Sequence, residues 1–232
     1  MPGRPFLQIP GPTLVPERIV RAMCEPIIDH RGPRFAALVH ECLDGLKGIF
    51  KTQGHILLFP GSGTGAWEAA IVNTLSPGDR VLACINGHFS TGFAKTAAAY
   101  GIEVERLEVP YGDGVPGDRV EARLRADGAH QIRAVLMVHN ETSTGVTSNV
   151  AAVRRALDQA RHPALLLVDT VSSLASIDFR MDEWSVDVTL TGPQKGLMLP
   201  PGMAILAANE KAVTASEKAK CPRSYWDWAP VI

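Results

Sequence analysis

The run Ala164-Leu-Leu-Leu-Val-Asp169 decides the fold of this chain. Its apolar residues are consecutive and do not alternate with polar ones, which is typical of a parallel strand buried on both faces of a sheet. A carboxylate ends the run, and burial of a carboxylate is costly unless it is paired or hydrogen-bonded. We therefore expect a sheet with helices on both faces and Asp169 at the end of one of its strands.

Strand-like and helix-like segments alternate along most of the chain. Short apolar runs predict strands at residues 56–59, 81–85, 103–109, 134–138, 165–168, 186–190 and 204–207. Helices are predicted between most of them and before the first, at residues 33–50, 65–75, 91–100, 118–126 and 150–161. This alternation predicts βαβ units and an α/β fold, with a mainly parallel seven-stranded sheet sandwiched by helices.

Two parts of unequal size are predicted. Residues 1–35 form an N-terminal arm, because five of the first 16 residues are proline and exclude a regular helix or a central strand there. Residues 36–232 form one large domain. The aromatic segment Tyr225-Trp-Asp-Trp228 is followed by no closing element, so we expect this domain to be cut short.

Composition and charge restrict the class of protein. Hydrophobic residues make up 46% of the chain and charged residues 20%, which is ordinary for a globular domain. The formal net charge of −1 gives no indication of a surface for nucleic acid or for an anionic membrane. Four scattered cysteines, no Cys/His spacing for a metal, no long apolar segment and no signal-peptide pattern predict a cytoplasmic protein with reduced thiols.

Three chemical groups follow predicted strands. They are the glycine-rich turn Pro60-Gly-Ser-Gly-Thr-Gly65, the carboxylate of Asp169, and Lys195 within Thr191-Gly-Pro-Gln-Lys-Gly196. Ligands of open α/β sheets collect at the carboxyl ends of the strands. Together these groups can hold pyridoxal phosphate: the amine forms a Schiff base with the aldehyde, the carboxylate pairs with the pyridinium nitrogen, and the turn binds the phosphate.

Each group also has a simpler interpretation. The turn can be a tight strand-to-helix connection, because it is neither a full dinucleotide-binding fingerprint nor a Walker loop. Asp169 can cap a helix or accept structural hydrogen bonds. Lysines are usually solvated, but Lys195 lies in an apolar, kinked segment where desolvation would lower its pKa and favour the free amine. His30 and His139 are interpreted as hydrogen-bonded structural residues.

Four motifs in this order resemble the class V aminotransferases of PLP fold type I, in particular the serine–glyoxylate and alanine–glyoxylate group. The resemblance extends from Ile9 to about the end of the chain. The motifs are Pro60-Gly-Ser-Gly-Thr-Gly65, His139-Asn-Glu-Thr-Ser-Thr-Gly145, Leu166-Leu-Val-Asp-Thr-Val-Ser-Ser173 and Thr191-Gly-Pro-Gln-Lys-Gly196.

The resemblance implies roles for individual residues. Lys195 would form the Schiff base and carry the proton between Cα and C4′, and Asp169 would pair with the pyridine nitrogen. Residues implied to bind the phosphate are Ser62, Gly63 and Thr64, with Gln194 beside it. Residues implied to contact the ring are Phe89 and Val171 on opposite faces, with Thr142 in hydrogen-bonding reach. The Pro10-Gly-Pro12 loop would border the substrate pocket.

The resemblance implies a PLP-dependent transfer of an amino group from a small amino acid to glyoxylate, giving glycine and a 2-oxo acid. Serine is the favoured donor, and aspartate–glyoxylate and alanine–glyoxylate transfer are the alternatives. A cysteine desulfurase is disfavoured, because no nucleophilic cysteine motif is evident. Family members are homodimers.

Family members also run well beyond 232 residues, so we expect a small C-terminal domain with a carboxylate-binding arginine to be missing. A different class of function follows from this length: a truncated, non-catalytic PLP-binding domain. Its exposed aromatic tail, residues 225–228, would then be an interaction surface.

Overall fold

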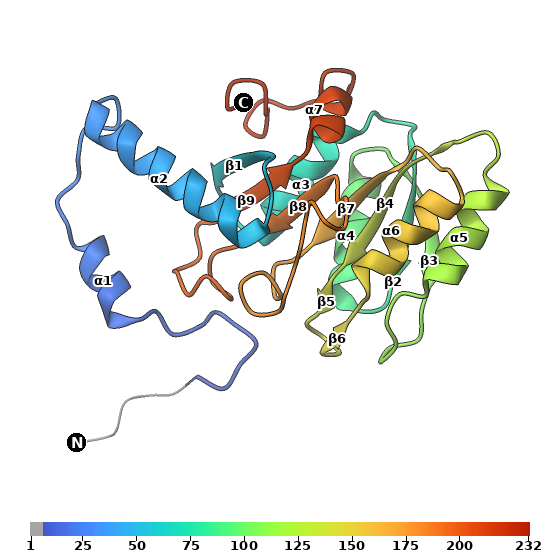
Figure 1. Ribbon diagram of the computed structural model, residues 1–232, viewed down its shortest axis with the longest axis horizontal. Helices are drawn as coiled ribbons and strands as arrows, with labels where there is room; N and C mark the ends of the chain where they lie inside the picture. The colour runs from blue at the N-terminus through green and yellow to red at the C-terminus, as the bar shows by residue number, and fades with distance from the viewer. Residues whose placement is uncertain (1–6) are drawn as a thin grey trace.

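The computed structural model of the protein describes residues 7–232 (Figure 1). The first six residues of the predicted arm, with Pro2 and Pro5, lie outside the described residues. Seven strands in the described part form one sheet in the order β1-β9-β8-β7-β4-β2-β3, which confirms the predicted fold class. Their bounds are His55–Pro60 for β1, Arg80–Ile85 for β2, Glu103–Glu108 for β3, Ile132–Val138 for β4, Leu165–Asp169 for β7, Val188–Thr191 for β8 and Met203–Ala208 for β9.

Strand direction brings several loops to one edge of this sheet. β9 runs antiparallel to both of its neighbours, β1 and β8, whereas the remaining neighbours in the sheet pair in parallel. Two reversals leave β1 pointing the same way as β8. The carboxyl ends of β1, β4, β7 and β8 therefore meet at the same edge, where ligands bind in open α/β sheets.

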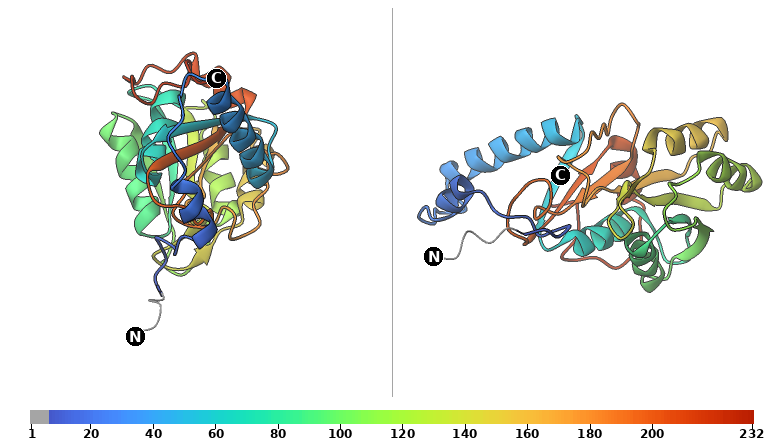
Figure 2. Two further views of the ribbon diagram at one scale, coloured as in Figure 1. Left: turned by 90° about the vertical axis from the view of Figure 1, so that its left-hand side faces the viewer. Right: turned by 90° about the horizontal axis from the view of Figure 1, so that it is seen from below.

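Helices cover both faces of the sheet (Figures 1 and 2). One apolar core lies under α3 (Gly63–Thr74), α4 (His88–Ala99) and α7 (Glu210–Ser216). The other lies under α5 (Gly117–Ala126), α6 (Val150–Gln159) and the end of α2 (Pro33–Phe50).

β7 alternates between these two cores, as a strand buried on both faces should. Leu165 and Leu167 belong to the core under α3 and α4, and Leu166 and Val168 belong to the core under α5 and α6. All five of its residues are buried, which confirms the expectation for this strand. Asp169 is therefore held in the interior by the packing of the residues before it.

Some short elements were not predicted. They are α1 (Glu17–Met23), α7, and the hairpin of β5 (Asn140–Glu141) with β6 (Val146–Thr147). α1 buries none of its residues, so it needs no apolar stripe that a sequence pattern could reveal. The two-residue strands of the hairpin are too short for alternation to appear.

The helix predicted at residues 33–50 coincides with α2, which projects from the body of the molecule (Figure 2). Phe50, at its end, is its single buried residue, and Leu38 and Ile49 are exposed. The predicted boundary after residue 35 falls in the first turn of this helix. Within residues 7–232, no helix is both long enough and apolar enough to cross a membrane.

The expectation of an exposed aromatic tail at residues 225–228 is wrong for most of the segment. Trp228 is fully buried and belongs to the core under α3, and Trp226 is half-buried against it. Asn73 of α3 fixes both: its Oδ1 accepts from the Trp228 backbone N–H at 3.1 Å, and its Nδ2 donates to the Trp226 carbonyl at 2.7 Å. Only Tyr225 keeps a largely exposed ring.

Leu167→Ala tests the two-sided burial of β7. Leu167 is fully buried, so we expect the free energy of unfolding to fall by about 2–5 kcal/mol, through lost apolar contact and the cavity that remains. Urea denaturation measures this fall. Tyr111→Ala, in the exposed turn after β3, is the control and should cost less than about 1 kcal/mol. Equal losses in the two variants would contradict the described packing of β7.

Candidate active site

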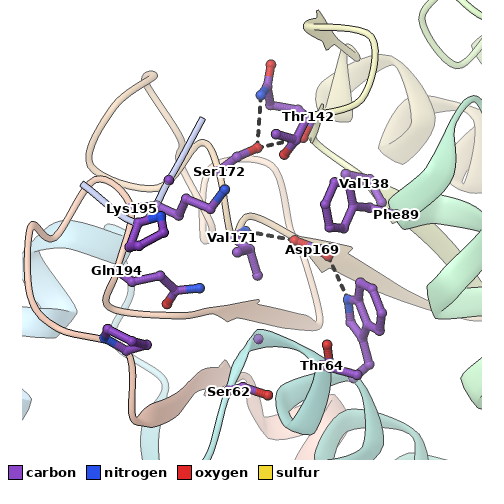
Figure 3. Close-up of a pocket in the computed structure, with 16 residues that line it drawn as sticks. Ser62, Thr64, Phe89, Val138, Thr142, Asp169, Val171, Ser172, Gln194 and Lys195 are labelled. Atoms are coloured by element: carbon purple, nitrogen blue, oxygen red, sulfur yellow. Dashed lines mark hydrogen bonds between the residues drawn. The ribbon is translucent and has the colours of Figure 1, made fainter. Parts of the chain in front are cut away.

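A cavity of about 330 Å³ lies at the carboxyl edge of the sheet (Figure 3). It is formed by the start of α3, the start of α4, the β5–β6 hairpin, and the segments after β7 and β8. Gly11 and Pro12 of the N-terminal arm also line it. The structure brings all nine residues predicted for the site into this lining: Ser62, Gly63, Thr64, Phe89, Thr142, Asp169, Val171, Gln194 and Lys195.

Asp169 is the most buried charged group of the cavity, with 2% of its surface exposed. Its Oδ2 accepts a hydrogen bond from Trp67 Nε1 at 2.6 Å, and its Oδ1 accepts from the Val171 backbone N–H at 2.7 Å. These two donors fix the orientation of the carboxylate (Figure 3). Asp169 does not cap a helix, because the residues after it form turns.

Burial raises the pKa of Asp169 to about 6. The hydrogen bonds from Val171 and Trp67 act in the opposite direction, the negative charge of Glu141 raises the pKa further, and Lys195 lowers it. The two N–H donors are therefore not enough to offset desolvation. A cationic group bound next to this carboxylate would stabilise its ionised form.

Lys195 enters the cavity from the segment after β8. Its Nζ donates a hydrogen bond to the carbonyl of Pro10 at 2.7 Å. Partial burial lowers the pKa of the amine, and the negative charge of Asp169 offsets part of that effect. A lowered pKa increases the fraction of free amine, which is the form that reacts with an aldehyde.

The arm packs closely on this lysine. Thr13 donates from its backbone N–H to the Gln194 carbonyl at 2.9 Å and from its Oγ1 to the Lys195 carbonyl at 3.2 Å. Gly11 has a φ of +135°, and a Cβ there would lie 2.5 Å from Cδ of Lys195. A side chain at position 11 would therefore displace the lysine, so a glycine is needed there.

The glycine-rich turn leads into the N-terminus of α3. Ser62 is the N-cap, and its Oγ accepts from the Gly65 backbone N–H at 3.2 Å. A Cβ on Gly63 would lie 2.8 Å from Cγ2 of Val171, so this glycine lets the segment after β7 contact the first turn of α3. The first amides of a helix lack intrahelical partners and attract anions, so this end of the cavity suits a phosphate.

Glu141 holds the opposite wall of the cavity and was not predicted. It is fully buried and accepts from the backbone N–H groups of Phe89 at 3.2 Å, Ser90 at 2.9 Å and Ser143 at 3.2 Å, and from Ser143 Oγ at 2.7 Å. Burial alone would raise its pKa, but these hydrogen bonds outweigh burial and lower it. The carboxylate thus joins the start of α4, which carries Phe89, to the β5–β6 hairpin, which carries Thr142.

Trp67 is the second residue that sequence reasoning missed. It lies one turn into α3, directly after the glycine-rich turn, and only 7% of its surface is exposed. Glu141 could have been found from its position inside the motif 139–145. An acid buried there needs hydrogen-bond partners, because burial of an unpaired charge is costly. No comparable signal existed for Trp67, because an apolar residue on a helix usually packs in a core.

His139 has the structural role that was predicted for it. It is buried, and its Nδ1 lies 2.9 Å from Ser173 Oγ. Burial lowers its pKa to about 4, so the ring is neutral at physiological pH. It does not line the cavity.

The residues of the cavity fit pyridoxal phosphate. Asp169 is a buried carboxylate that no cation among residues 7–232 hydrogen-bonds, as a site for a pyridinium nitrogen requires. Lys195 supplies an amine, and the start of α3 supplies amides and hydroxyls for a phosphate. The buried Oε1 of Gln194 has no hydrogen-bond partner among the described residues, so it can accept a hydrogen bond from a ligand.

Comparison with known proteins supports the same interpretation of the cavity. A model of the aminotransferase class-V family matches residues 6–222. The chain is 56% identical to the L-aspartate–glyoxylate aminotransferase of Paracoccus denitrificans, over 94% of this chain and 56% of that protein. It is 47% identical to the serine–glyoxylate aminotransferase of Methylorubrum extorquens, over 98% of this chain and 58% of that protein. The chain thus spans a little over half the length of these relatives.

The fold is also similar to that of solved structures. The crystal structure of the ureidoglycine–glyoxylate aminotransferase of Bacillus subtilis has a TM-score of 0.91 to this chain at 28% identity. The match covers 100% of this chain and 59% of that one. Together with the two sequence relatives, this structure indicates a shared large domain.

Asp169→Asn tests the raised pKa of this carboxylate in the cofactor-free protein. The folded-state pKa of about 6 exceeds the unfolded value of 3.8, so wild-type stability falls as pH rises from 3.8 to 6. The variant does not titrate. Its free energy of unfolding, relative to the wild type, should therefore rise by roughly 2 kcal/mol between pH 4 and pH 7.

Urea denaturation at several pH values measures this difference. Asp178→Asn is the control, because Asp178 is exposed and its hydrogen bonds to Lys51 and Arg180 lower its pKa. That variant should show no gain over the same range. A flat difference for Asp169→Asn would contradict a raised pKa at this position.

Proposed function

Since the chain belongs to the aminotransferase class-V family, we propose that its cavity serves the transfer of an amino group from a small amino acid to glyoxylate. The observation that carries this proposal is the presence of the Lys195 amine and the buried Asp169 carboxylate in one cavity beside the N-terminus of α3. Aminotransferases of this class use pyridoxal phosphate, which supplies an aldehyde for the amino group and a ring that accepts electrons.

The phosphate end of the cofactor would be held by the start of α3. Four groups are proposed to contact it: the hydroxyls of Ser62 and Thr64, the backbone N–H of Gly63 and the side-chain NH2 of Gln194. The positive end of the helix dipole stabilises an anion at this position. These contacts fix the remaining atoms of the cofactor relative to Lys195 and Asp169.

Asp169 would accept the ring N–H and keep the ring nitrogen protonated. Trp67 and Val171 already orient the carboxylate through its two oxygens, so little reorganisation is needed on binding. Phe89 and Val171 are proposed to pack on the two ring faces, which holds the ring in one orientation within the cavity. Thr142 is proposed to donate or accept a hydrogen bond at the ring edge.

Lys195 would bind the aldehyde carbon and later act as the base. Its lowered pKa makes the free amine available for both steps. As the base, Nζ would take the proton from Cα of the amino acid and deliver it to C4′ of the cofactor. The carbonyl of Pro10 gives the ammonium form a hydrogen-bond acceptor while it holds that proton.

The amino donor has two candidates. The resemblance of the four motifs favours serine. Aspartate is supported by a specific observation, the 56% identity to an L-aspartate–glyoxylate aminotransferase against 47% to a serine–glyoxylate enzyme. Glyoxylate is the acceptor named for both relatives.

We also propose that the protein is a cytoplasmic homodimer with an arm at residues 1–35 and a large domain at residues 36–232. The exposed apolar side chains of α2, among them Leu38 at 50% and Ile49 at 37%, support contact with a second copy. The balanced charge of the chain argues against nucleic acid or an anionic membrane as a partner.

Borohydride reduction in the presence of pyridoxal phosphate tests the role of Lys195. We expect a stable adduct on the peptide that contains Lys195, detected by mass spectrometry, and its loss in Lys195→Ala. Lys211→Ala is the matched control, because Lys211 is also half-exposed and donates to a carbonyl, that of Ala164, at 2.9 Å. Equal labelling of wild type and Lys195→Ala would contradict the assignment.

Turnover with glyoxylate tests the reaction and the donor. We expect glycine to form from glyoxylate, together with hydroxypyruvate if serine is the donor or oxaloacetate if aspartate is. Lys195→Ala should lower kcat by about 10²-fold or more, because the base is removed. If the protein binds the cofactor but forms no glycine from glyoxylate with serine, aspartate or alanine as the donor, a non-catalytic cofactor-binding domain is favoured instead.

A further inference from the structure

The glycine-rich turn has two sides with different neighbours. Ser62, Gly63 and Thr64, in its middle, line the cavity, whereas the flanking Gly61 and Gly65 do not. A Cβ on Gly65 would lie 2.7 Å from Cη2 of Trp226, and a Cβ on Gly61 would lie 3.0 Å from the same atom. The outer side of the turn is therefore in contact with one indole ring.

Trp226 is held in place by groups from α3 and β1. Its Nε1 donates to Glu68 Oε2 at 3.2 Å, and Tyr100 Oη donates to the same oxygen at 3.0 Å. Its carbonyl accepts from Asn73 Nδ2 at 2.7 Å. The ring meets Phe59 of β1 edge-on, with centroids 5.6 Å apart. An indole fixed in this way is a rigid surface.

The neighbouring residue adds a further restraint. Tyr225 Oη donates to the carbonyl of Pro60, the first residue of the turn, at 2.9 Å. On the sheet side, the Gly61 backbone N–H donates to the Gly202 carbonyl at 2.9 Å. The turn is thus bounded by the sheet on one side and by the C-terminal segment on the other.

We propose that Trp226 is a positioning residue for the cofactor phosphate: its indole supports the turn from outside, so that residues 62–64 stay directed into the cavity. This inference rests on the proposed function. Three glycines in five residues would otherwise give the turn many backbone conformations, and fixing one of them at the moment of binding would weaken affinity. The contact with Trp226 limits that freedom before the ligand arrives.

The affinities of pyridoxal phosphate and of pyridoxal test this proposal. The two ligands differ only in the phosphate, so their affinity ratio isolates the phosphate contacts. In Trp226→Ala, the dissociation constant for pyridoxal phosphate should rise ~10-fold or more. That for pyridoxal should stay within ~2-fold of the wild-type value. Fluorescence or absorbance titration of the full chain gives both constants.

Trp228→Phe is the matched control. Trp228 is the next tryptophan in the same segment and is fully buried, but it contacts the core and not the glycine-rich turn. This variant should lose stability in urea denaturation and keep the wild-type ratio of the two affinities. If both variants change the ratio equally, Trp226 acts only through general stability and the proposal is overturned.

Gly65→Ala provides a second test that does not depend on removing a large side chain. In the wild-type background, the added methyl would meet the indole at 2.7 Å, so the turn must shift and the affinity for pyridoxal phosphate should fall. In the Trp226→Ala background the methyl has room, and no further fall is expected. Independent effects of the two substitutions would overturn the proposal.

The two affinities of the wild-type protein distinguish a failure of this inference from a failure of the proposed function on which it rests. If the wild type binds pyridoxal phosphate no better than pyridoxal, the phosphate site itself is wrong and both proposals fail. If the wild type prefers pyridoxal phosphate and Trp226→Ala keeps that full preference, only the role of Trp226 is overturned.

Discussion

The constraint on which the site depends is the burial of one carboxylate. β7 lies inside the sheet with an apolar core on each face, so its last residue, Asp169, is carried into the interior. Two N–H donors fix its oxygens, yet its pKa still rises to about 6. The carboxylate is therefore oriented but under-stabilised in its charged form, and a bound cation would stabilise that form.

Strand direction decides which groups can share that environment. The turn after β1, Asp169 at the end of β7 and Lys195 after β8 are distant in sequence but meet because their strands point the same way. β9 makes this possible, because it separates β1 from β8 and runs against both. With one reversal in place of two, the glycine-rich turn would lie at the opposite edge of the sheet.

The local sequence predicts the charged groups of the site that lie in apolar segments. Asp169 ends an apolar strand and Lys195 lies in an apolar segment, so each is costly without a function, and both line the cavity. Trp67 was not predictable, because its bond to Asp169 depends on how α3 is rotated relative to β7. The burial of Trp228 and Trp226 was misjudged for the same reason: their partner Asn73 is far away in sequence.

The glycines of the site have a different role from the one that the local sequence suggests. In a glycine-rich turn they are expected to let the backbone approach a ligand. Here a Cβ at Gly63 would meet Val171, one at Gly65 would meet Trp226, and one at Gly87 would meet Glu141. Each of these glycines lets a side chain of the protein approach the backbone closely. Because those side chains are themselves fixed by packing or hydrogen bonds, the close contacts that the glycines allow restrict the backbone around the cavity.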